Sequence, residues 1–302
     1  MHNSRRNFLK NSALAVAATS IFPNDIFAAA RKKRIVGIQL YTVREDMKKD
    51  PAGTLKALAA MGYHYVEHAN YIDRKFYGHS ATEFKSLLDS LGLKMLSGHT
   101  RMDPKHWDAV KKDFTDEWKW TVDDAATVGQ QFVISPWLDE SLRKTYDDML
   151  RYMDVFNKSG ELCKKHGMKF GYHNHDFEFS QVLGNKKVFD IILQNTDPEL
   201  VAQQLDMGNL YNGGAIAIAI VMQYPGRFEL MHVKDEIKAA SGNDKYESTI
   251  LGEGIVNTKQ VIDLGKKSAG TYQFIIEQES YQGKSPLECS KTDLEIMKKW
   301  GY

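Results

Sequence analysis

The 302-residue sequence has only two cysteines, Cys163 and Cys289, and seven prolines. Two cysteines exclude a disulfide-rich scaffold and a zinc site built from cysteines. The few prolines and 22 glycines exclude a collagen-like or low-complexity chain, and 11% aromatic residues argue against disorder. The net charge is only +1, which argues against a broad basic face for nucleic acid. We therefore expect an ordinary globular protein without a nucleic-acid partner.

Residues 1–30 have the composition of an export signal. Arg5 and Arg6 precede a short apolar stretch at 13–22, and small residues follow it, as in a secretory signal. The paired arginines resemble the twin-arginine export signal, which implies export of an already folded chain to the periplasm. No apolar run after this segment reaches membrane length, so we expect no stable membrane insertion once it is removed.

From residue 31 onward, a short apolar run, a polar turn and an amphipathic helical stretch recur eight times. This order is typical of βα units with a parallel sheet. Eight units in a chain of this length predict an α/β protein with a (β/α)₈ TIM barrel, and no linker divides 31–302, which we take as a single domain. An open doubly wound sheet is the alternative, but no Gly-rich phosphate fingerprint follows the first run. The expected strands are residues 35–40, 63–67, 94–98, 131–135, 168–173, 201–206, 228–233 and 272–277.

Ionisable residues stand at the ends of several of these runs. In a TIM barrel the carboxyl ends of the strands form the mouth, where catalytic residues gather. His173, Asp206, His232 and Glu277 end four consecutive runs, so we expect their side chains to converge. Two imidazoles and two carboxylates suit Mn²⁺, Zn²⁺, Co²⁺ or Fe²⁺ better than an all-oxygen Mg²⁺ or Ca²⁺ site. The sequence thus predicts one divalent metal ion held by these four residues.

Six short segments resemble the xylose-isomerase-like barrel superfamily, in its branch of sugar phosphate isomerases and epimerases, which also includes inosose and 3-dehydroshikimate dehydratases. The resemblance implies a metal ion with ligands from strands five to eight, which by position are the same four residues. In many epimerases of this superfamily the strand-five ligand is a glutamate that also acts as a base. This sequence has His173 there, which puts a symmetrical two-glutamate mechanism in doubt. The segments are 37–41, 172–178, 205–209, 232–235, 251–254 and 276–277.

The resemblance and the predicted ligands imply a metal-dependent sugar isomerase or epimerase. Its expected substrate is a free sugar, a keto-sugar or a glycoside, which would react through an enediolate. A dehydratase or lyase of the inosose or dehydroshikimate type is the alternative, and a non-catalytic carbohydrate-binding protein is a second one. A metal-dependent endonuclease fits poorly with the near-neutral charge. Many barrels of this branch associate, so a homo-oligomer is also among the expectations.

Proton transfer needs a base within hydrogen-bond reach of the substrate. Glu277, His175 and Lys234 are the candidate catalytic residues; Lys234 follows His232 by two residues and should face the same side, unless it is a solvated lysine at the rim. Glu178 is interpreted as structural, because alternation along an extended segment would turn it away from His173. The candidate substrate-binding residues are Glu67, His99, Trp137, Tyr41 and Asn209.

Two further expectations concern a loop and the thiols. The polar segment 236–254 follows the seventh run and is a candidate active-site loop. Cys163 and Cys289 fall in the fourth and eighth helical stretches, on opposite sides of a barrel. They are too far apart for a disulfide, so we expect free thiols.

Overall fold

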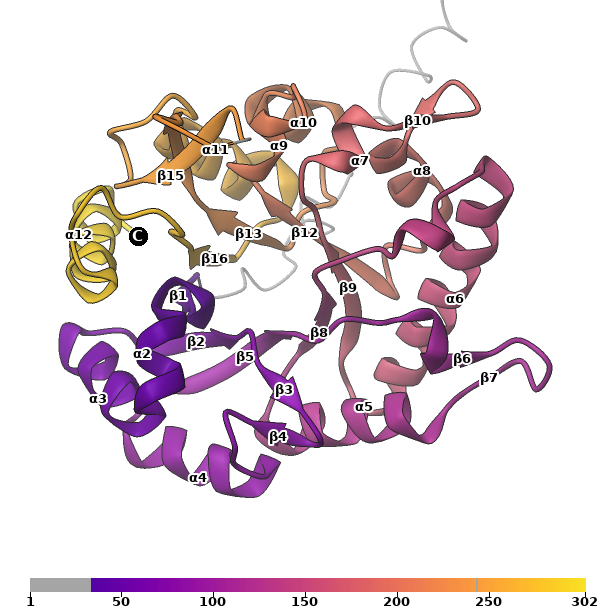
Figure 1. Ribbon diagram of the computed structural model, residues 1–302, viewed down its shortest axis with the longest axis horizontal. Coiled ribbons are helices and arrows are strands. Elements are labelled where there is room, and N and C mark those ends of the chain that lie inside the picture. The colour runs from indigo at the N-terminus through magenta and orange to yellow at the C-terminus, as the bar shows by residue number, and fades with distance from the viewer. Residues whose placement is uncertain (1–33, 243) are drawn as a thin grey trace, which may run out of the picture. The chain divides into compact units, whose positions relative to one another are not determined.

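A computed structural model describes residues 34–242 and 244–302, so the predicted signal at 1–30 lies outside the described residues. The described chain forms one closed barrel of eight parallel strands surrounded by helices (Figure 1). This confirms the predicted TIM barrel and its single-domain organisation. In order around the barrel, the strands are β1 (Ile35–Gln39), β2 (Tyr65–His68), β5 (Lys94–His99), β8 (Phe132–Ser135), β9 (Lys169–His173), β12 (Val201–Asp206), β13 (Leu230–Val233) and β16 (Gln273–Ile276).

The helices cover the outside of the barrel and begin and end at local signals. Ser80 and Ser285 each form a capping box with the glutamate three residues later, which satisfies backbone N–H groups of the first turn. Gly62 ends one helix in the left-handed region, with φ of 101°. The helices are α2 (Arg44–Lys49), α3 (Pro51–Met61), α4 (Ala81–Ser90), α5 (Asp116–Val128), α6 (Tyr146–Lys165), α7 (Phe177–Ser180), α8 (Val188–Asn195), α9 (Asn209–Asn212), α10 (Ala217–Gln223), α11 (Thr258–Leu264) and α12 (Pro286–Lys299).

Four short antiparallel hairpins lie between the barrel strands and the helices that follow them. The segment 236–254, predicted as an active-site loop, contains one of them, so part of it is paired backbone. The hairpins are β3 (Tyr71–Ile72) with β4 (Lys75–Phe76), β6 (Trp107–Asp108) with β7 (Asp113–Phe114), β10 (Val182–Leu183) with β11 (Lys186–Lys187), and β14 (Asp235–Lys238) with β15 (Tyr246–Thr249).

The barrel interior changes character along its axis. Near the amino ends of the strands it holds a small apolar cluster that includes Ile35, Phe132 and Tyr272. Phe132 and Tyr272 belong to non-adjacent parts of the barrel wall, and their rings lie 6.4 Å apart, so this cluster fills the interior. The carboxyl ends instead direct buried polar side chains inward. The polar interior therefore lies at the end where the sequence predicts the site.

Two large apolar clusters pack between the barrel and its helices. Cys163 belongs to the second of these clusters and Cys289 is buried in α12, and both thiols are free, as predicted. Across the described residues, we find no helix with the length and apolar character needed to cross a membrane.

Candidate metal and active site

The structure brings together the four residues predicted as metal ligands. His173, Asp206, His232 and Glu277 are all buried, and one ligand atom of each lies within 4.8 Å of the others. The Asp206 Oδ2 atom is 3.9 Å from both His173 Nε2 and His232 Nδ1. His232 Nδ1 also lies 2.9 Å from Glu277 Oε2. The parallel register contributes to this convergence, because it pairs Asp206 with His232, sets His173 beside Gln204 and brings Glu277 just beyond the pair of Val233 and Ile276.

The Asp206 carboxylate shows that the cluster fits a cation. Its Oδ1 accepts backbone hydrogen bonds from Gly208 at 2.8 Å and Asn209 at 2.7 Å. Its Oδ2 is buried without a hydrogen-bond partner among the described residues; the ammonium of Lys234 lies 3.2 Å from it, and the two histidine nitrogens lie 3.9 Å from it. Burying such an oxygen is costly unless positive charge compensates it. Two nitrogen and two oxygen donors suit a divalent transition metal or zinc, without selecting one of them.

Lys234 is a buried part of this cluster, only 1% exposed, and not a solvated lysine at the rim. Its Nζ lies 2.9 Å from Glu277 Oε2 and 2.5 Å from Glu279 Oε1. Burial alone would lower the pKa of Lys234, but Asp206, Glu277 and Glu279 hold it well above its ordinary value. In this arrangement the lysine is charged and donates hydrogen bonds to Asn209 and Glu279, and its role in catalysis stays a prediction.

Glu67 lies below the mouth and is not among the residues that line the cavity above the cluster. It is fully buried, and its carboxylate accepts hydrogen bonds from Gln39, Ser97 and Gln204. The same carboxylate lies 2.6 Å from His232 Nε2 and 3.2 Å from His99 Nε2. A substrate contact of Glu67 stays a prediction; in the structure its side chain points into the barrel and contacts protein groups. It supports the histidines.

The charges of this inner network follow from its contacts. Burial alone would raise the pKa of Glu67, but His99 and His232 hold it well below its ordinary value. Burial opposes the charge of His232, yet Glu277 and Glu67 raise its pKa to about 10. Burial, together with His232 and His99, lowers the pKa of His173 well below its ordinary value. His173 is therefore a neutral imidazole, the form that binds metal.

Gln204 connects the histidines, and the sequence analysis missed it. Its Oε1 lies at hydrogen-bond distance from His99 Nε2, at 2.7 Å, and from His173 Nδ1, at 3.0 Å. When His173 Nδ1 donates a hydrogen bond to Gln204 Oε1, the unprotonated Nε2 is free to face Asp206 and a metal ion. Gln204 precedes Asp206 by two residues on β12, and this spacing could have indicated the same inward face.

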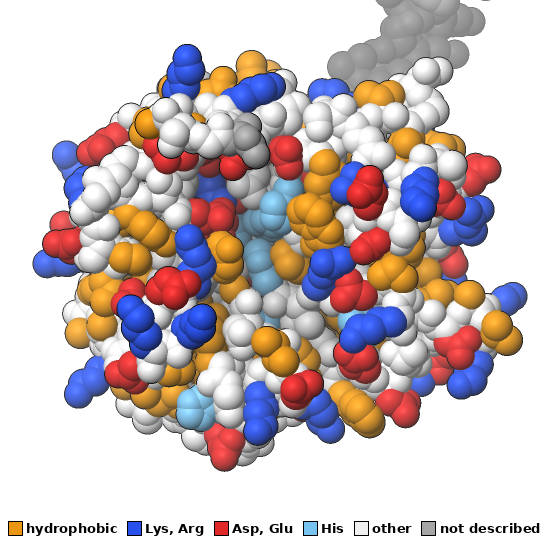
Figure 2. Space-filling model, in the orientation of Figure 1, with side chains coloured by type: hydrophobic (Ala, Val, Ile, Leu, Met, Phe, Trp, Pro, Cys, Tyr) orange, Lys and Arg blue, Asp and Glu red, His pale blue; other side chains and the backbone are white. Residues whose placement is uncertain are grey.

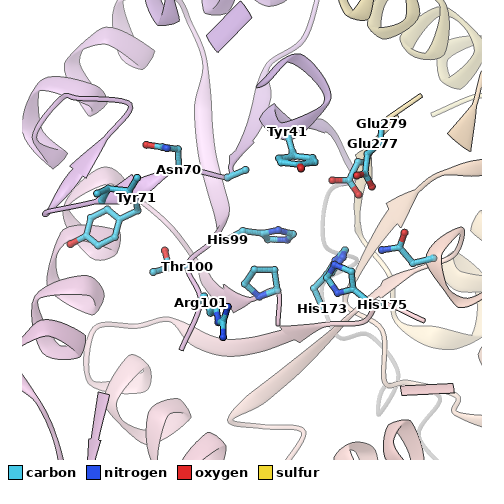
Figure 3. Close-up of a pocket in the computed structure, with 14 residues that line it drawn as sticks. Tyr41, Asn70, Tyr71, His99, Thr100, Arg101, His173, His175, Glu277 and Glu279 are labelled. Carbon is cyan, nitrogen blue, oxygen red and sulfur yellow. The ribbon is translucent and has the colours of Figure 1, made fainter. Parts of the chain in front are cut away.

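A cavity of about 380 Å³ opens above the cluster. Figure 2 shows histidine side chains within a hollow of this face, and Figure 3 shows His99, His173, His175 and Glu277 around the pocket. Among the predicted substrate-binding residues, Tyr41, His99 and Asn209 line it. Trp137 is absent from the lining of this cavity; its ring packs 5.2 Å from that of His175 and so supports it. The lining residues that the sequence analysis missed include Asn70, Arg101 and Glu279.

His175 and Glu178 form a second layer beside the cluster. Burial, with the charge of Lys234, lowers the pKa of His175 to about 3, so its imidazole is neutral and weakly basic. Glu178 accepts hydrogen bonds from the Tyr172 hydroxyl and from the backbone N–H of His175. It belongs to the short helix α7 and not to the extended segment that we expected. Its contacts are structural and fix the backbone of His175.

Comparison with curated proteins finds inosose dehydratases. The chain is 25% identical over 163 residues to that of Lactiplantibacillus plantarum, an alignment that covers 49% of this chain and 52% of the relative. It is 34% identical over 79 residues to that of Clostridium perfringens, covering 26% of each. The aligned segments thus span between a quarter and about half of these relatives.

Solved structures share the fold over nearly the whole chain. A sugar phosphate isomerase/epimerase from Parabacteroides distasonis is 24% identical, with a TM-score of 0.75, and the match covers 91% of this chain and 96% of that one. The IolI protein with a bound zinc atom is 13% identical, with a TM-score of 0.65, covering 88% and 97%. The family model for the xylose isomerase-like TIM barrel matches residues 55–300, and the chain therefore belongs to this family.

Proposed function

We propose that this protein is a metal-dependent enzyme that removes the proton next to the carbonyl of a free sugar, a keto-sugar or a glycoside that carries a keto group. The observation that carries this proposal is the cluster of His173, Asp206, His232 and Glu277 at the base of an open cavity. A bound divalent ion would polarise the substrate carbonyl and stabilise the negative charge of an enediolate. The inosose dehydratases among the relatives and the zinc in the IolI structure support the substrate class and the metal.

Glu277 is the best candidate for the base. Burial alone would raise its pKa, but Lys234 and His232 hold it well below its ordinary value, so it is ionised. It lines the cavity, and Glu279 follows it on the same side. Lys234 donates a hydrogen bond to Glu279. Its ion pair with Glu277 keeps the Glu277 carboxylate in place. A carboxylate held in one position within reach of substrate suits proton abstraction.

The distribution of carboxylates favours one base over two. Glu277 and Glu279 lie on one side of the cavity, whereas the described residues of the opposite wall include Asn70, Thr100 and Arg101 and no carboxylate. Inversion at a carbon by two bases needs one base on each face. With a single base, the enediolate loses a β-substituent or takes the proton back at the neighbouring carbon. We therefore propose elimination as the reaction, and one-base isomerisation as the second candidate.

Incubation in D₂O tests this proposal. The Mn²⁺-loaded protein is mixed with a panel of keto-sugars and 3-keto-glycosides, and products are followed by NMR and mass spectrometry. We expect loss of the α-proton with formation of an enone, or one deuterium in an isomerised sugar, and we expect Asp206→Asn to abolish both. If no substrate exchanges or reacts with Mn²⁺, Zn²⁺ or Co²⁺, the proposal is wrong. Sugar binding that survives Asp206→Ala would then identify a carbohydrate-binding protein.

We also propose that the enzyme acts in the periplasm on a small carbohydrate. The paired Arg5 and Arg6 before an apolar stretch support export of the folded chain. Replacing both arginines by lysine in a bacterial host should retain the protein in the cytoplasm, which fractionation and N-terminal mass spectrometry measure. Equal export of the two forms would contradict this part of the proposal.

A further inference from the structure

A second cavity, of about 610 Å³, lies beside the candidate active site. The two cavities share four lining residues, Tyr71, Ile72, Thr100 and Arg101. Figure 3 shows Tyr71, Thr100 and Arg101 on the side of the first cavity that faces away from Glu277. A ligand held above His173 can therefore extend past Ile72 and Arg101 into the second cavity without leaving the protein surface.

The second cavity has a rigid wall. Asp124 on α5 accepts hydrogen bonds from the Tyr71 hydroxyl at 2.6 Å and from Arg74 at 3.0 and 2.8 Å. These bonds fasten the β3–β4 hairpin to α5 and hold the Arg74 guanidinium 5.2 Å from the ring centre of Trp120. The wall is thus fixed before any ligand arrives, which reduces the entropy lost on binding.

Large apolar side chains remain exposed on this cavity. Trp120 is 44% exposed and Ile72 is 61% exposed, and both line it. An exposed aromatic ring beside polar groups is a common platform for an amphipathic ligand. The C–H face of a sugar ring can pack on the indole of Trp120 while its hydroxyls bond to the polar groups around it.

The charges around this cavity are balanced and already paired. Arg101 forms ion pairs with Asp103 at 2.5 Å and Asp139 at 2.9 Å, and Lys105 pairs with Glu117 at 2.7 Å. The other lining guanidinium, that of Arg74, is bound by Asp124 as described above. A phosphate or carboxylate ligand needs cations that are not already neutralised. The lining therefore suits an uncharged ligand with many hydroxyl groups.

We propose that the second cavity binds a second, uncharged sugar ring, so that the substrate is a disaccharide or another neutral glycoside and not a sugar phosphate. The identity of the reacting ring rests on the proposed function. Binding of the second ring does not, because it involves Trp120 and Ile72, which are not part of the metal cluster.

Calorimetric titration tests this proposal. Cellobiose, maltose and trehalose are compared with glucose and glucose 6-phosphate on the Mn²⁺-loaded wild type and on Trp120→Ala and Trp120→Phe. We expect at least one disaccharide to bind about tenfold more tightly than glucose, or better. Trp120→Ala should remove this preference and Trp120→Phe should retain most of it. Met222→Ala, which removes an exposed apolar side chain on α10 outside both cavities, is the control and should change nothing.

Several outcomes would overturn the inference: no disaccharide binds better than glucose, glucose 6-phosphate binds most tightly, or Trp120→Ala keeps the preference. Ile72→Ser provides a second variant, at the junction of the cavities, if Trp120→Ala does not fold. A disaccharide preference without any reaction in D₂O would contradict the proposed function and leave the inference intact. Reaction of monosaccharides without a disaccharide preference would support the proposed function and overturn this inference.

Discussion

Glu67 shows how one buried carboxylate determines the chemistry of residues on other strands. It lies on β2, yet its hydrogen bonds reach Gln39 on β1, Ser97 on β5, Gln204 on β12 and His232 on β13. The Glu67 carboxylate accepts a hydrogen bond from His232 Nε2. The other ring nitrogen, Nδ1, is then directed at Asp206 and Glu277. Such carboxylate partners fix the tautomer and the orientation of metal-binding histidines.

We expect Glu67→Gln to weaken Mn²⁺ binding by about 10- to 100-fold, the usual cost of losing an outer-shell partner. Glutamine keeps the volume but loses the charge that holds the proton on His232 Nε2. Calorimetric titration of the metal-free variant measures this effect. Ser97→Ala removes one hydrogen bond to Glu67 without touching a histidine and should have a smaller effect. Equal affinities of Glu67→Gln and wild type would refute the positioning role.

At the scale of elements, Asp235 fastens the loop after β15 to the start of β14. Its carboxylate accepts four backbone N–H groups, those of Glu236, Gly252, Gly254 and Val256, at 2.8 to 3.2 Å. A Cβ on Gly254 would lie 2.2 Å from Asp235 Oδ1, so a larger residue cannot approach as closely. This contact joins the segments 232–235 and 251–254, both of which carry the family resemblance.

Asp235→Asn should therefore destabilise the protein by about 2–4 kcal/mol, because an amide accepts these four donors less well and brings an N–H group among them. The free energy of unfolding in urea measures this loss. Asp244→Asn, on the same hairpin but exposed, is the matched control and should stay within about 0.5 kcal/mol of wild type. A similar small effect for both variants would show that the loop does not depend on this carboxylate.

At the scale of the whole molecule, Asp293 makes stability depend on pH. It is fully buried in α12, where Oδ1 accepts the Leu251 N–H at 3.0 Å and Oδ2 has no partner among the described residues. Burial raises its pKa to about 7, whereas an unfolded aspartate titrates near pH 3.9. Between these values the folded chain holds the extra proton, so stability falls as the pH rises from about 4 to 7.

Asp293→Asn should remove this contribution. We expect the variant to lose less stability than wild type between pH 5 and pH 8, and to be more stable at pH 8 by at most about 4 kcal/mol. Urea denaturation across this range measures both curves. Burial raises the pKa of Glu178 and Glu236 as well, so only the difference between the two proteins reports on Asp293. Parallel curves would contradict the prediction.

The sequence predicts the barrel and the four clustered residues because strand period and strand ends determine both. His173, Asp206, His232 and Glu277 needed only the rule that parallel strands end at one face. The burial depth of Glu67 could not be predicted from the sequence, because it depends on how neighbouring side chains fill the barrel interior. The second cavity could not be predicted either, because β3 and β4 have two residues each and carry no periodic signal. The expected extended conformation of Glu178 is wrong, because the residue lies in the short helix α7, and its structural role stays a prediction that its hydrogen bonds to Tyr172 and His175 support.

The buried cysteines have a consequence for a chain that we propose to be exported. Burial raises the pKa of Cys163 to about 12, and the thiol of Cys289 is also covered. Oxidants attack the thiolate, so neither sulfur offers the reactive form at neutral pH. A protein that folds before export would thus enter an oxidising compartment with its reduced sulfurs protected and with no need of disulfide-forming enzymes.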